Sequence, residues 1–132
     1  MLDRLGVANV EVRTAAELDD IDALVLPGGE SGTMSMLLDR NGLFSPIADR
    51  LAAGMPALGT CAGTILLGRE VVDGRADQHS FGALDLVVRR NGYGRQVDSF
   101  EAEIWLPGDD EAFPATFIRA PVIDAVGSDV EV

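Results

Sequence analysis

Two short apolar runs, each closed by a glycine turn and followed by a helical pattern, restrict the folds open to this chain. The first covers residues 23–26 and ends in Pro27-Gly28-Gly29, and the second covers residues 56–60. Unbroken apolar runs of this length are typical of parallel strands that are buried on both faces. The sequence therefore predicts an α/β fold with a mainly parallel sheet and helices on both faces.

The other predicted elements fit this class. One helix begins at Ser31 or Thr33, whose hydroxyl groups make good N-caps, and ends at Asn41-Gly42. The remaining predicted helical segments are a last helical turn at residues 1–5, a turn at residues 14–20 capped by Thr14 and Glu17, and helices at residues 45–53 and 62–70. Further strands are predicted at residues 7–12, 84–89, 100–106 and 115–118.

Composition excludes several classes of protein. The chain has 132 residues, enough for one domain, and its 22 acidic and 10 basic side chains give a net charge of −12. Because an acidic surface repels phosphate backbones, we expect no nucleic-acid partner. No apolar run approaches the about 20 residues that cross a bilayer, so we expect no membrane partner. A single cysteine and a short charged N-terminus without the pattern of a secretory signal favour a cytoplasmic protein.

The turn after the second apolar run carries the candidate nucleophile. Gly59-Thr60-Cys61-Ala62-Gly63 is the cysteine form of the Gly-x-Ser-x-Gly nucleophile elbow. The sharp turn strains the backbone of Cys61, and the glycines on either side let neighbouring backbone approach without a Cβ clash. At a helix N-terminus the dipole favours a thiolate, and the backbone N–H of Ala62 points at the reacting centre as an oxyanion donor. The alternative is that Cys61 is a small buried hydrophobe, as most lone cysteines are.

Further polar residues stand at predicted strand ends. Residues 27–31 follow a buried strand, as the cysteine turn does, and α/β proteins bind ligands at that edge of the sheet. The two glycines expose amides to an anion or a carbonyl oxygen, but no Lys-Ser/Thr follows, so the turn is not a P-loop. Four arginines have two possible roles: each either binds a substrate carboxylate through two hydrogen bonds or is a solvated surface charge. They are Arg89, Arg90, Arg95 and Arg119.

His79 is the only histidine of the chain. A Cys–His catalytic pair needs it beside Cys61. It stands in a turn-like stretch, residues 78–82, which favours a structural or interfacial role over that of a base. The residues alone therefore indicate a nucleophile without an evident base.

The motifs together resemble one family. In chain order they are Leu24-Val25-Leu26-Pro27-Gly28-Gly29-Glu30-Ser31, Gly59-Thr60-Cys61-Ala62-Gly63, Gln78-His79-Ser80-Phe81-Gly82, Arg90-Asn91-Gly92-Tyr93-Gly94-Arg95-Gln96, Ser99-Phe100-Glu101-Ala102 and Phe117-Ile118-Arg119-Ala120-Pro121. They resemble the glutaminase subunits of the two-component pyridoxal 5′-phosphate synthase, which are class I (triad) glutamine amidotransferases. The elbow alone indicates the amidotransferase superfamily, whereas the stretches at 90–96 and 117–121 are specific to this subunit.

The resemblance implies a fold and a reaction. The fold is a flavodoxin-like three-layer sandwich with added strands, and the reaction is the hydrolysis of L-glutamine to L-glutamate and ammonia through a γ-glutamyl thioester on Cys61. The positions that match the family's glutamine-binding residues are Gly29, Glu30, Ser31, Arg90, Ile118 and Arg119. The first three belong to the loop that holds glutamine and helps form the oxyanion hole. The ammonia passes to a partner synthase subunit that makes pyridoxal phosphate, vitamin B6, and the glutaminase itself needs no cofactor or metal.

The sequence departs from the family pattern in two places. The family begins with a strand carrying Leu-Gln-Gly before a long helix, and its catalytic base lies in a later His-Pro-Glu segment, whereas His79 matches a different position. We therefore expect residues 1–132 to be a single, incomplete amidotransferase domain with some exposed apolar sheet surface. Without a base that contributes about 10² to 10⁴ in rate, the chain alone is expected to be nearly inactive. Two alternatives stay open: a binding module that docks without turnover, and another cysteine hydrolase on a flavodoxin-like sheet.

Overall fold

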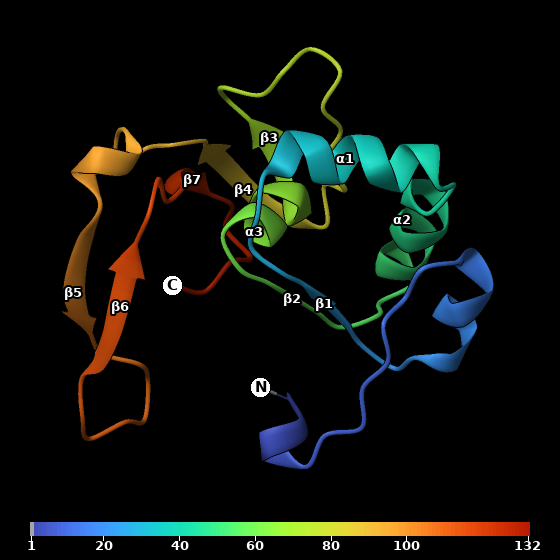
Figure 1. Ribbon diagram of the computed structural model, residues 1–132, viewed down its shortest axis with the longest axis horizontal. Coiled ribbons are helices and arrows are strands. Elements are labelled where there is room, and N and C mark those ends of the chain that lie inside the picture. Colours follow the sequence, from blue (N-terminus) through green and yellow to red (C-terminus); the bar gives the residue numbers. More distant parts are fainter. Residues whose placement is uncertain (1) are drawn as a thin grey trace.

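The two apolar runs form neighbouring strands in the computed structural model, which describes residues 2–132. Strand β1 (Leu24–Leu26) pairs in parallel with β2 (Ala57–Gly59), and Val25 lies opposite Leu58. Helices α1 (Ser31–Arg40) and α2 (Phe44–Ala52) connect the two strands, and α3 (Ala62–Leu67) follows β2 (Figure 1). The predicted arrangement of parallel strands with helical connections is confirmed around both glycine turns.

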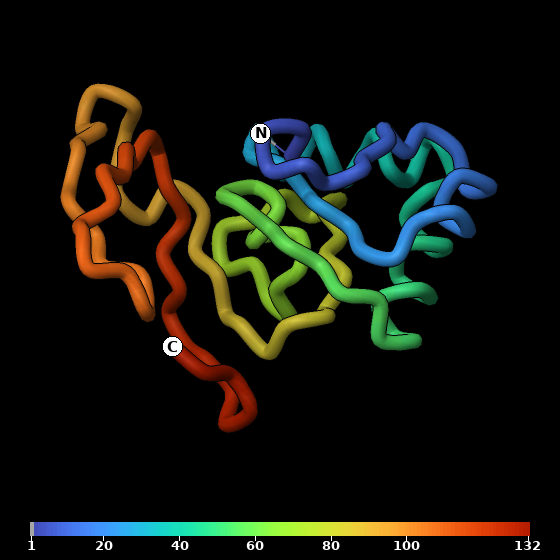
Figure 2. Tube along the Cα trace, turned by 90° about the horizontal axis from the view of Figure 1, so that it is seen from below, coloured from blue at the N-terminus to red at the C-terminus, as the bar shows by residue number. Residues whose placement is uncertain are grey.

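The second half of the chain adds strands. Strand β4 (Leu84–Arg89) pairs in parallel with β3 (Gly68–Val71) and antiparallel with β7 (Val122–Val126). Strands β5 (Phe100–Ile104) and β6 (Phe113–Phe117) form an antiparallel hairpin, which stands apart from the helices in Figure 2. The predicted α/β class is confirmed, although within residues 2–132 the hydrogen bonds join the strands as three separate groups rather than as one sheet.

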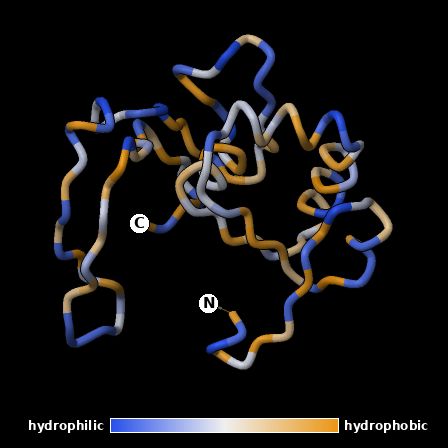
Figure 3. The backbone as a smooth tube through the Cα atoms, in the orientation of Figure 1, coloured by the Kyte–Doolittle hydropathy of each residue, from blue (hydrophilic) through white to orange (hydrophobic). Residues whose placement is uncertain are grey.

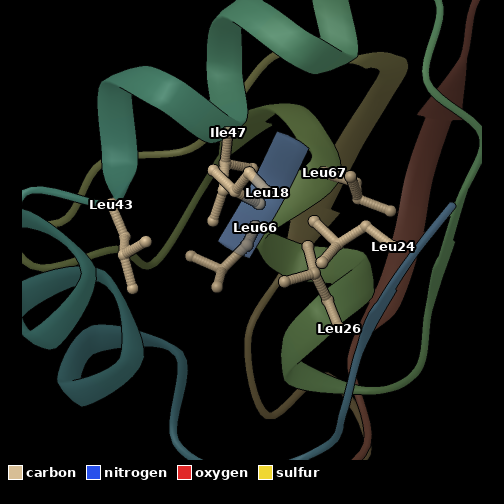
Figure 4. Close-up of a cluster of buried hydrophobic side chains, with 7 residues drawn as sticks. All are labelled: Leu18, Leu24, Leu26, Leu43, Ile47, Leu66 and Leu67. Atoms are coloured by element: carbon tan, nitrogen blue, oxygen red, sulfur yellow. The ribbon is translucent and has the colours of Figure 1, made fainter. Parts of the chain in front are cut away.

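Two hydrophobic clusters hold helix α3 from different sides. The larger cluster gathers side chains from the 3-10 helix η2 (Ala15–Asp20), β1, α2 with the residue before it, and α3. It comprises Leu18, Leu24, Leu26, Leu43, Ile47, Leu66 and Leu67 (Figure 4). The smaller cluster packs Ile65 against Leu86 and Val88 of β4. Because burial of one such side chain contributes about 1.5–3 kcal/mol, the second half of α3, which supplies Ile65, Leu66 and Leu67, is firmly held.

The expectation that β1 and β2 are buried on both faces is wrong. Leu24 and Leu26 are 8% and 5% exposed, but Val25 and Leu58, which point to the other face, are 44% and 53% exposed. Figure 3 shows both strands as hydrophobic stretches of the chain. The helices therefore cover one face of this strand pair within residues 2–132, and apolar sheet surface is exposed, as expected.

The predicted strand at residues 7–12 is also wrong. Within residues 2–132 the segment pairs with no strand, and Val7 and Val10 are largely exposed. A cavity of about 960 Å³ lies between this segment, β1 and α1. The alternating pattern that predicts a strand describes which side chains face which side, but a strand also needs a neighbour for its backbone hydrogen bonds.

Several element boundaries differ from the predicted ones. Helix α3 ends at Leu67 rather than at residue 70, because the chain becomes extended at Gly68 and enters β3. Helix α2 begins at Phe44, so Pro46 stands inside its first turn, where a missing N–H costs nothing. Strand β6 begins at Phe113, ahead of the predicted 115, and β7 is not predicted.

The N-terminal turns are as predicted. The carboxylate of Glu17 accepts a hydrogen bond of 2.8 Å from the backbone N–H of Thr14, which is half of the expected capping box. A 3-10 helix covers Leu2–Leu5, and Gly6 follows with a φ of 68°; residue 1 lies outside the described part. No helix within residues 2–132 has the length and apolar character to cross a membrane.

Candidate active site

Cys61 occupies a strained backbone conformation between β2 and α3. Its φ is 51° and its ψ is −106°, a region that residues with a side chain rarely adopt. Such a conformation costs about 1–3 kcal/mol and persists only where the surrounding structure enforces it. The thiol is exposed, so the alternative that Cys61 is a buried hydrophobe is wrong. The strained turn presents the sulfur to solvent, as a nucleophile elbow requires.

The two glycines of the elbow allow the backbone contacts that enforce this turn. A Cβ atom on Gly63 would lie 2.0 Å from the carbonyl oxygen of Leu26, and one on Gly59 would lie 2.7 Å from the carbonyl carbon of Gly63. The backbone N–H of Thr60 donates a hydrogen bond of 3.1 Å to the same Leu26 oxygen. The predicted reason for glycine at both positions is therefore confirmed.

The first glycine turn passes directly beside the nucleophile. A Cβ atom on Gly28 would lie 3.5 Å from the Cβ of Cys61. The two turns thus meet at the carboxyl ends of β1 and β2, as the parallel pairing requires. Ala62 is the first residue of α3, and within residues 2–132 its backbone N–H donates no hydrogen bond, which leaves it available as an oxyanion donor.

Glu30 caps helix α1, in place of the predicted Ser31 or Thr33. Its carboxylate accepts hydrogen bonds from the backbone N–H groups of Gly32 (3.1 Å) and Thr33 (2.6 Å) and from the Thr33 hydroxyl (2.7 Å). These bonds, first of all those from Thr33, together with the nearby charge of Arg90, hold the pKa of Glu30 below its ordinary value. A carboxylate held in this way is ionised at neutral pH and fixes the loop beside Cys61.

This lowered pKa predicts a pH dependence of stability that a Glu30→Gln variant lacks. A carboxyl group whose pKa is lowered by folding stabilises the fold above its unfolded pKa, about 4.3, and loses that contribution as the pH falls through the folded pKa. We therefore expect the free energy of unfolding of the wild type to exceed that of Glu30→Gln by about 1 kcal/mol at pH 7. This difference is expected to shrink below about pH 4.3. Urea unfolding at a series of pH values measures it. Glu103→Gln, at an exposed position of β5, is the control, and a difference that stays constant below pH 4 would contradict the assignment.

A hydrogen-bonded network joins three of the predicted substrate-binding residues. Arg90, just after β4, donates to a Glu30 carboxylate oxygen at 2.5 Å and to the side-chain oxygen of Gln78 at 3.2 Å. Gln78 in turn donates to the hydroxyl of Ser31 at 3.2 Å. The Arg90 side chain is 16% exposed. Gln78 is not among the predicted site residues; its only signal in the sequence is its place in one of the family motifs.

The other three arginines that the sequence singles out, Arg89, Arg95 and Arg119, lie outside this network. Arg89 forms an ion pair with Asp124 at 2.6 Å, and Arg95 forms one with Asp98 at 3.4 Å. Both pairs are solvent-accessible, so these two arginines are surface charges. Arg119, which precedes strand β7, has a φ of 46°. Its side chain makes no hydrogen bond within residues 2–132.

Ile118 and Arg119 lie in the segment that leads from β6 to β7. Val122, at the start of β7, is opposite Arg89 in the sheet, and a Cβ on Gly92 would lie 2.5 Å from the Val122 side chain. The segment therefore runs beside the turn that follows Arg90. Ile118 is 53% exposed, and the structure places neither residue in the network of Glu30, Gln78 and Arg90.

His79 is engaged away from Cys61. Its backbone N–H donates to the hydroxyl of Ser35 at 2.8 Å, its Nε2 lies 3.4 Å from a carboxylate oxygen of Asp39, and its ring packs edge-on against Phe44. These contacts fit the structural role expected from the sequence. Within residues 2–132 no side chain hydrogen-bonds the thiol of Cys61.

Comparison of the sequence with known proteins shows which family it matches. Residues 1–132 match the model of the SNO glutamine amidotransferase family. The chain is 54% identical over 132 residues to a pyridoxal 5′-phosphate synthase subunit PdxT of Nocardioides sp., covering 100% of this chain and 66% of that relative. It is 56% identical over 128 residues to the subunit of the same name from Acidothermus cellulolyticus, covering 96% of this chain and 62% of that relative.

A solved structure shares the fold. A crystal structure of a glutamine amidotransferase matches with a TM-score of 0.88 and 42% sequence identity, over 99% of this chain and 69% of that chain. The chain thus spans about two thirds of the length of the proteins that it matches.

Proposed function

The chain belongs to the SNO glutamine amidotransferase family, and we propose that it is the glutaminase of a two-component pyridoxal 5′-phosphate synthase. In this proposal residues 1–132 are a single, incomplete amidotransferase domain that supplies the nucleophile for the hydrolysis of L-glutamine to L-glutamate and ammonia. The observation that carries the proposal is the exposed Cys61, held at a φ of 51° by the close contact of Gly63 with Leu26. A strained, exposed thiol at a strand-to-helix turn is suited to acyl transfer.

The proposed reaction begins at the thiol. The Cys61 sulfur attacks the side-chain amide carbon, and the backbone N–H groups of Ala62 and Gly29 stabilise the oxyanion that forms. Ammonia leaves as the γ-glutamyl thioester forms, and water then releases glutamate. The proton transfers in both steps require a general acid–base group, and no side chain within residues 2–132 contacts the thiol to supply it.

The network beside Cys61 supplies substrate recognition in this proposal. Glu30 is ionised and suited to the α-ammonium group of glutamine, and Arg90 is suited to its α-carboxylate. Ser31, Ile118 and Arg119 complete the binding residues that the family resemblance implies. Two features support this part: the direct Arg90–Glu30 contact and the contact between the Gly28 turn and Cys61.

We further propose that ammonia passes directly to a synthase subunit in the cytoplasm. The curated relatives are each described as a subunit of pyridoxal 5′-phosphate synthase. Ammonia is a better nucleophile than ammonium, so a route shielded from solvent between the two subunits preserves its reactivity. In this proposal the glutaminase requires no cofactor of its own, because the nucleophile and the oxyanion donors are groups of the protein.

Ammonia release tests the proposed function. A full-length version of the protein, mixed with its synthase subunit, is expected to release ammonia from L-glutamine at least about 10-fold faster than from L-asparagine, which is one methylene shorter. A coupled assay that detects ammonia measures both rates. Equal rates with the two amides would indicate a different cysteine hydrolase.

A second candidate is a module that binds the synthase without turnover. The observation that favours it is the lack of any hydrogen-bond partner for the Cys61 thiol within residues 2–132. The same samples separate the two candidates. Co-purification with the synthase but no ammonia release would indicate the binding module, whereas release of ammonia indicates the enzyme.

A further inference from the structure

We propose that Gln78 is a positioning residue, which orients Arg90 toward the carboxylate of the substrate. The inference rests on the proposed function, because it concerns how the binding network of that site is held together. Gln78 lies between β3 and β4 and is half-buried. It is the one residue that contacts both Arg90 after β4 and Ser31 in α1 within the described network.

The chemistry of the two partners determines which way the Gln78 amide points. A guanidinium group only donates hydrogen bonds, so the amide oxygen must face Arg90 and the NH₂ group must face elsewhere. The NH₂ group donates to the hydroxyl of Ser31, which is 2% exposed. The reverse orientation would bring two donors together at Arg90. The amide is therefore locked at both ends, and its side chain ties α1 to the end of β4.

Two contacts fix the plane of the Arg90 guanidinium. Nη2 donates to Glu30 and Nη1 donates to Gln78, so both terminal nitrogens are held from the protein side. Of the five N–H donors of the group, about three remain for a ligand. A long arginine side chain loses much rotamer freedom when it binds a carboxylate in a forked geometry. The contacts with Glu30 and Gln78 hold the Arg90 side chain in place in the absence of substrate, so little further rotamer entropy is lost when the carboxylate binds.

The lack of charge on Gln78 matters for substrate binding as much as its shape does. Glu30 already offsets the positive charge of Arg90, and a second carboxylate at position 78 would give the network a net negative charge. An anionic substrate group would then be repelled. Glutamate at this position keeps both contacts, since it accepts from Arg90 and from the Ser31 hydroxyl, and changes only the charge. Gln78→Glu therefore tests the charge of the network, whereas removal of the amide tests its hydrogen bonds.

The test compares Gln78→Met, which removes both contacts, with Gln78→Glu, which keeps them and adds a charge. Gln96→Met is the matched control, because Gln96 is exposed and its side chain makes no hydrogen bond within residues 2–132. In complex with the synthase, each Gln78 variant is expected to raise the KM for glutamine about 10-fold or more, with kcat within about 2-fold of wild type. Gln96→Met is expected to leave both constants unchanged.

A second measurement does not depend on turnover. A chloroketone analogue of glutamine, with its amino and carboxylate groups intact, and iodoacetamide, which has neither, both alkylate Cys61. The ratio of the two alkylation rates reports recognition of the charged groups, and iodoacetamide alone reports the state of the thiol. We expect the ratio to fall about 10-fold in both Gln78 variants and to stay constant in Gln96→Met.

The outcomes separate this inference from the proposed function. A wild type that shows neither ammonia release nor a preference for the analogue would overturn the proposed function, and the inference with it. A wild type that shows both, together with a folded Gln78→Met variant that behaves like it, would overturn the positioning role alone. If Gln78→Met fails to fold, Gln78→Asn decides the question, because its amide is one methylene shorter and cannot reach both Arg90 and Ser31; a wild-type KM and alkylation ratio in this variant would overturn the positioning role.

Discussion

Replacement of Cys61 by alanine in a full-length version of the protein is expected to lower the release of ammonia from glutamine by at least about 10⁴-fold, because residues 1–132 hold no other thiol at the elbow to form the thioester. The fold is expected to persist, since the thiol is exposed and buries little surface. The measurement is the coupled ammonia assay in the presence of the synthase, with circular dichroism as the check on folding. Retained activity in a folded Cys61→Ala variant would contradict the role of the thiol.

A glycine at the same position adds a test of the strained turn. Alanine keeps a side chain at a φ of 51°, whereas glycine adopts this conformation without the cost of about 1–3 kcal/mol. Part of this gain is offset by the greater freedom of glycine in the unfolded chain, about 0.5–1 kcal/mol. We therefore expect Cys61→Gly to be about 1 kcal/mol more stable than Cys61→Ala, and equally inactive. A less stable glycine variant in urea unfolding would show that the turn is not strained.

Replacement of Gly63 by alanine is expected to destabilise the protein by about 3 kcal/mol or more. In an exposed helix the same change stabilises by about 1 kcal/mol, so helix propensity alone predicts the opposite sign. Here the added Cβ would lie 2.0 Å from the carbonyl oxygen of Leu26, and both atoms belong to backbone that the core holds in place. Overpacking of this kind forces the strand and the helix apart.

The matched control for this variant is Gly42→Ala. Gly42 has a φ of 66°, and a Cβ atom added there would meet no other atom within 4 Å. Its replacement therefore costs only the left-handed backbone penalty, about 1–2 kcal/mol. Urea unfolding measures both variants. If Gly63→Ala were as stable as Gly42→Ala, the close contact between α3 and β1 would not be what fixes the elbow.

The elbow could be predicted from the sequence because its requirements are local. A strand, a sharp turn and a helix need glycine at fixed positions around the nucleophile, and Gly59 and Gly63 stand at those positions. The close approach of the Leu26 carbonyl to Gly63 explains why the pattern carries that information. The helical connection between β1 and β2 follows from the same reasoning, since parallel strands need a crossover.

The parts that sequence reasoning missed depend on contacts between distant residues. Glu30 replaces Ser31 as the helix cap because it also meets Arg90, which lies 60 residues further along the chain. Gln78 acquires its place in the network only because Arg90, after β4, and Ser31, at the start of α1, both lie within reach of its side chain. The pattern of residues 7–12 fits a strand, yet no neighbour lies close enough to pair with it in the described part of the chain. Helix and strand propensities and the spacing of residues do not indicate such contacts between distant parts of the chain.

Covalent capture of Cys61 by a substrate mimic shows whether this thiol is the nucleophile of a glutamine-binding site. The protein is incubated with the chloroketone analogue of glutamine, with and without excess L-glutamine, and its intact mass is measured, with Cys61→Ala as the control. We expect a single addition on Cys61 that glutamine suppresses and that the alanine variant lacks. An addition that excess glutamine leaves unchanged, or the same addition in Cys61→Ala, would contradict this role of Cys61.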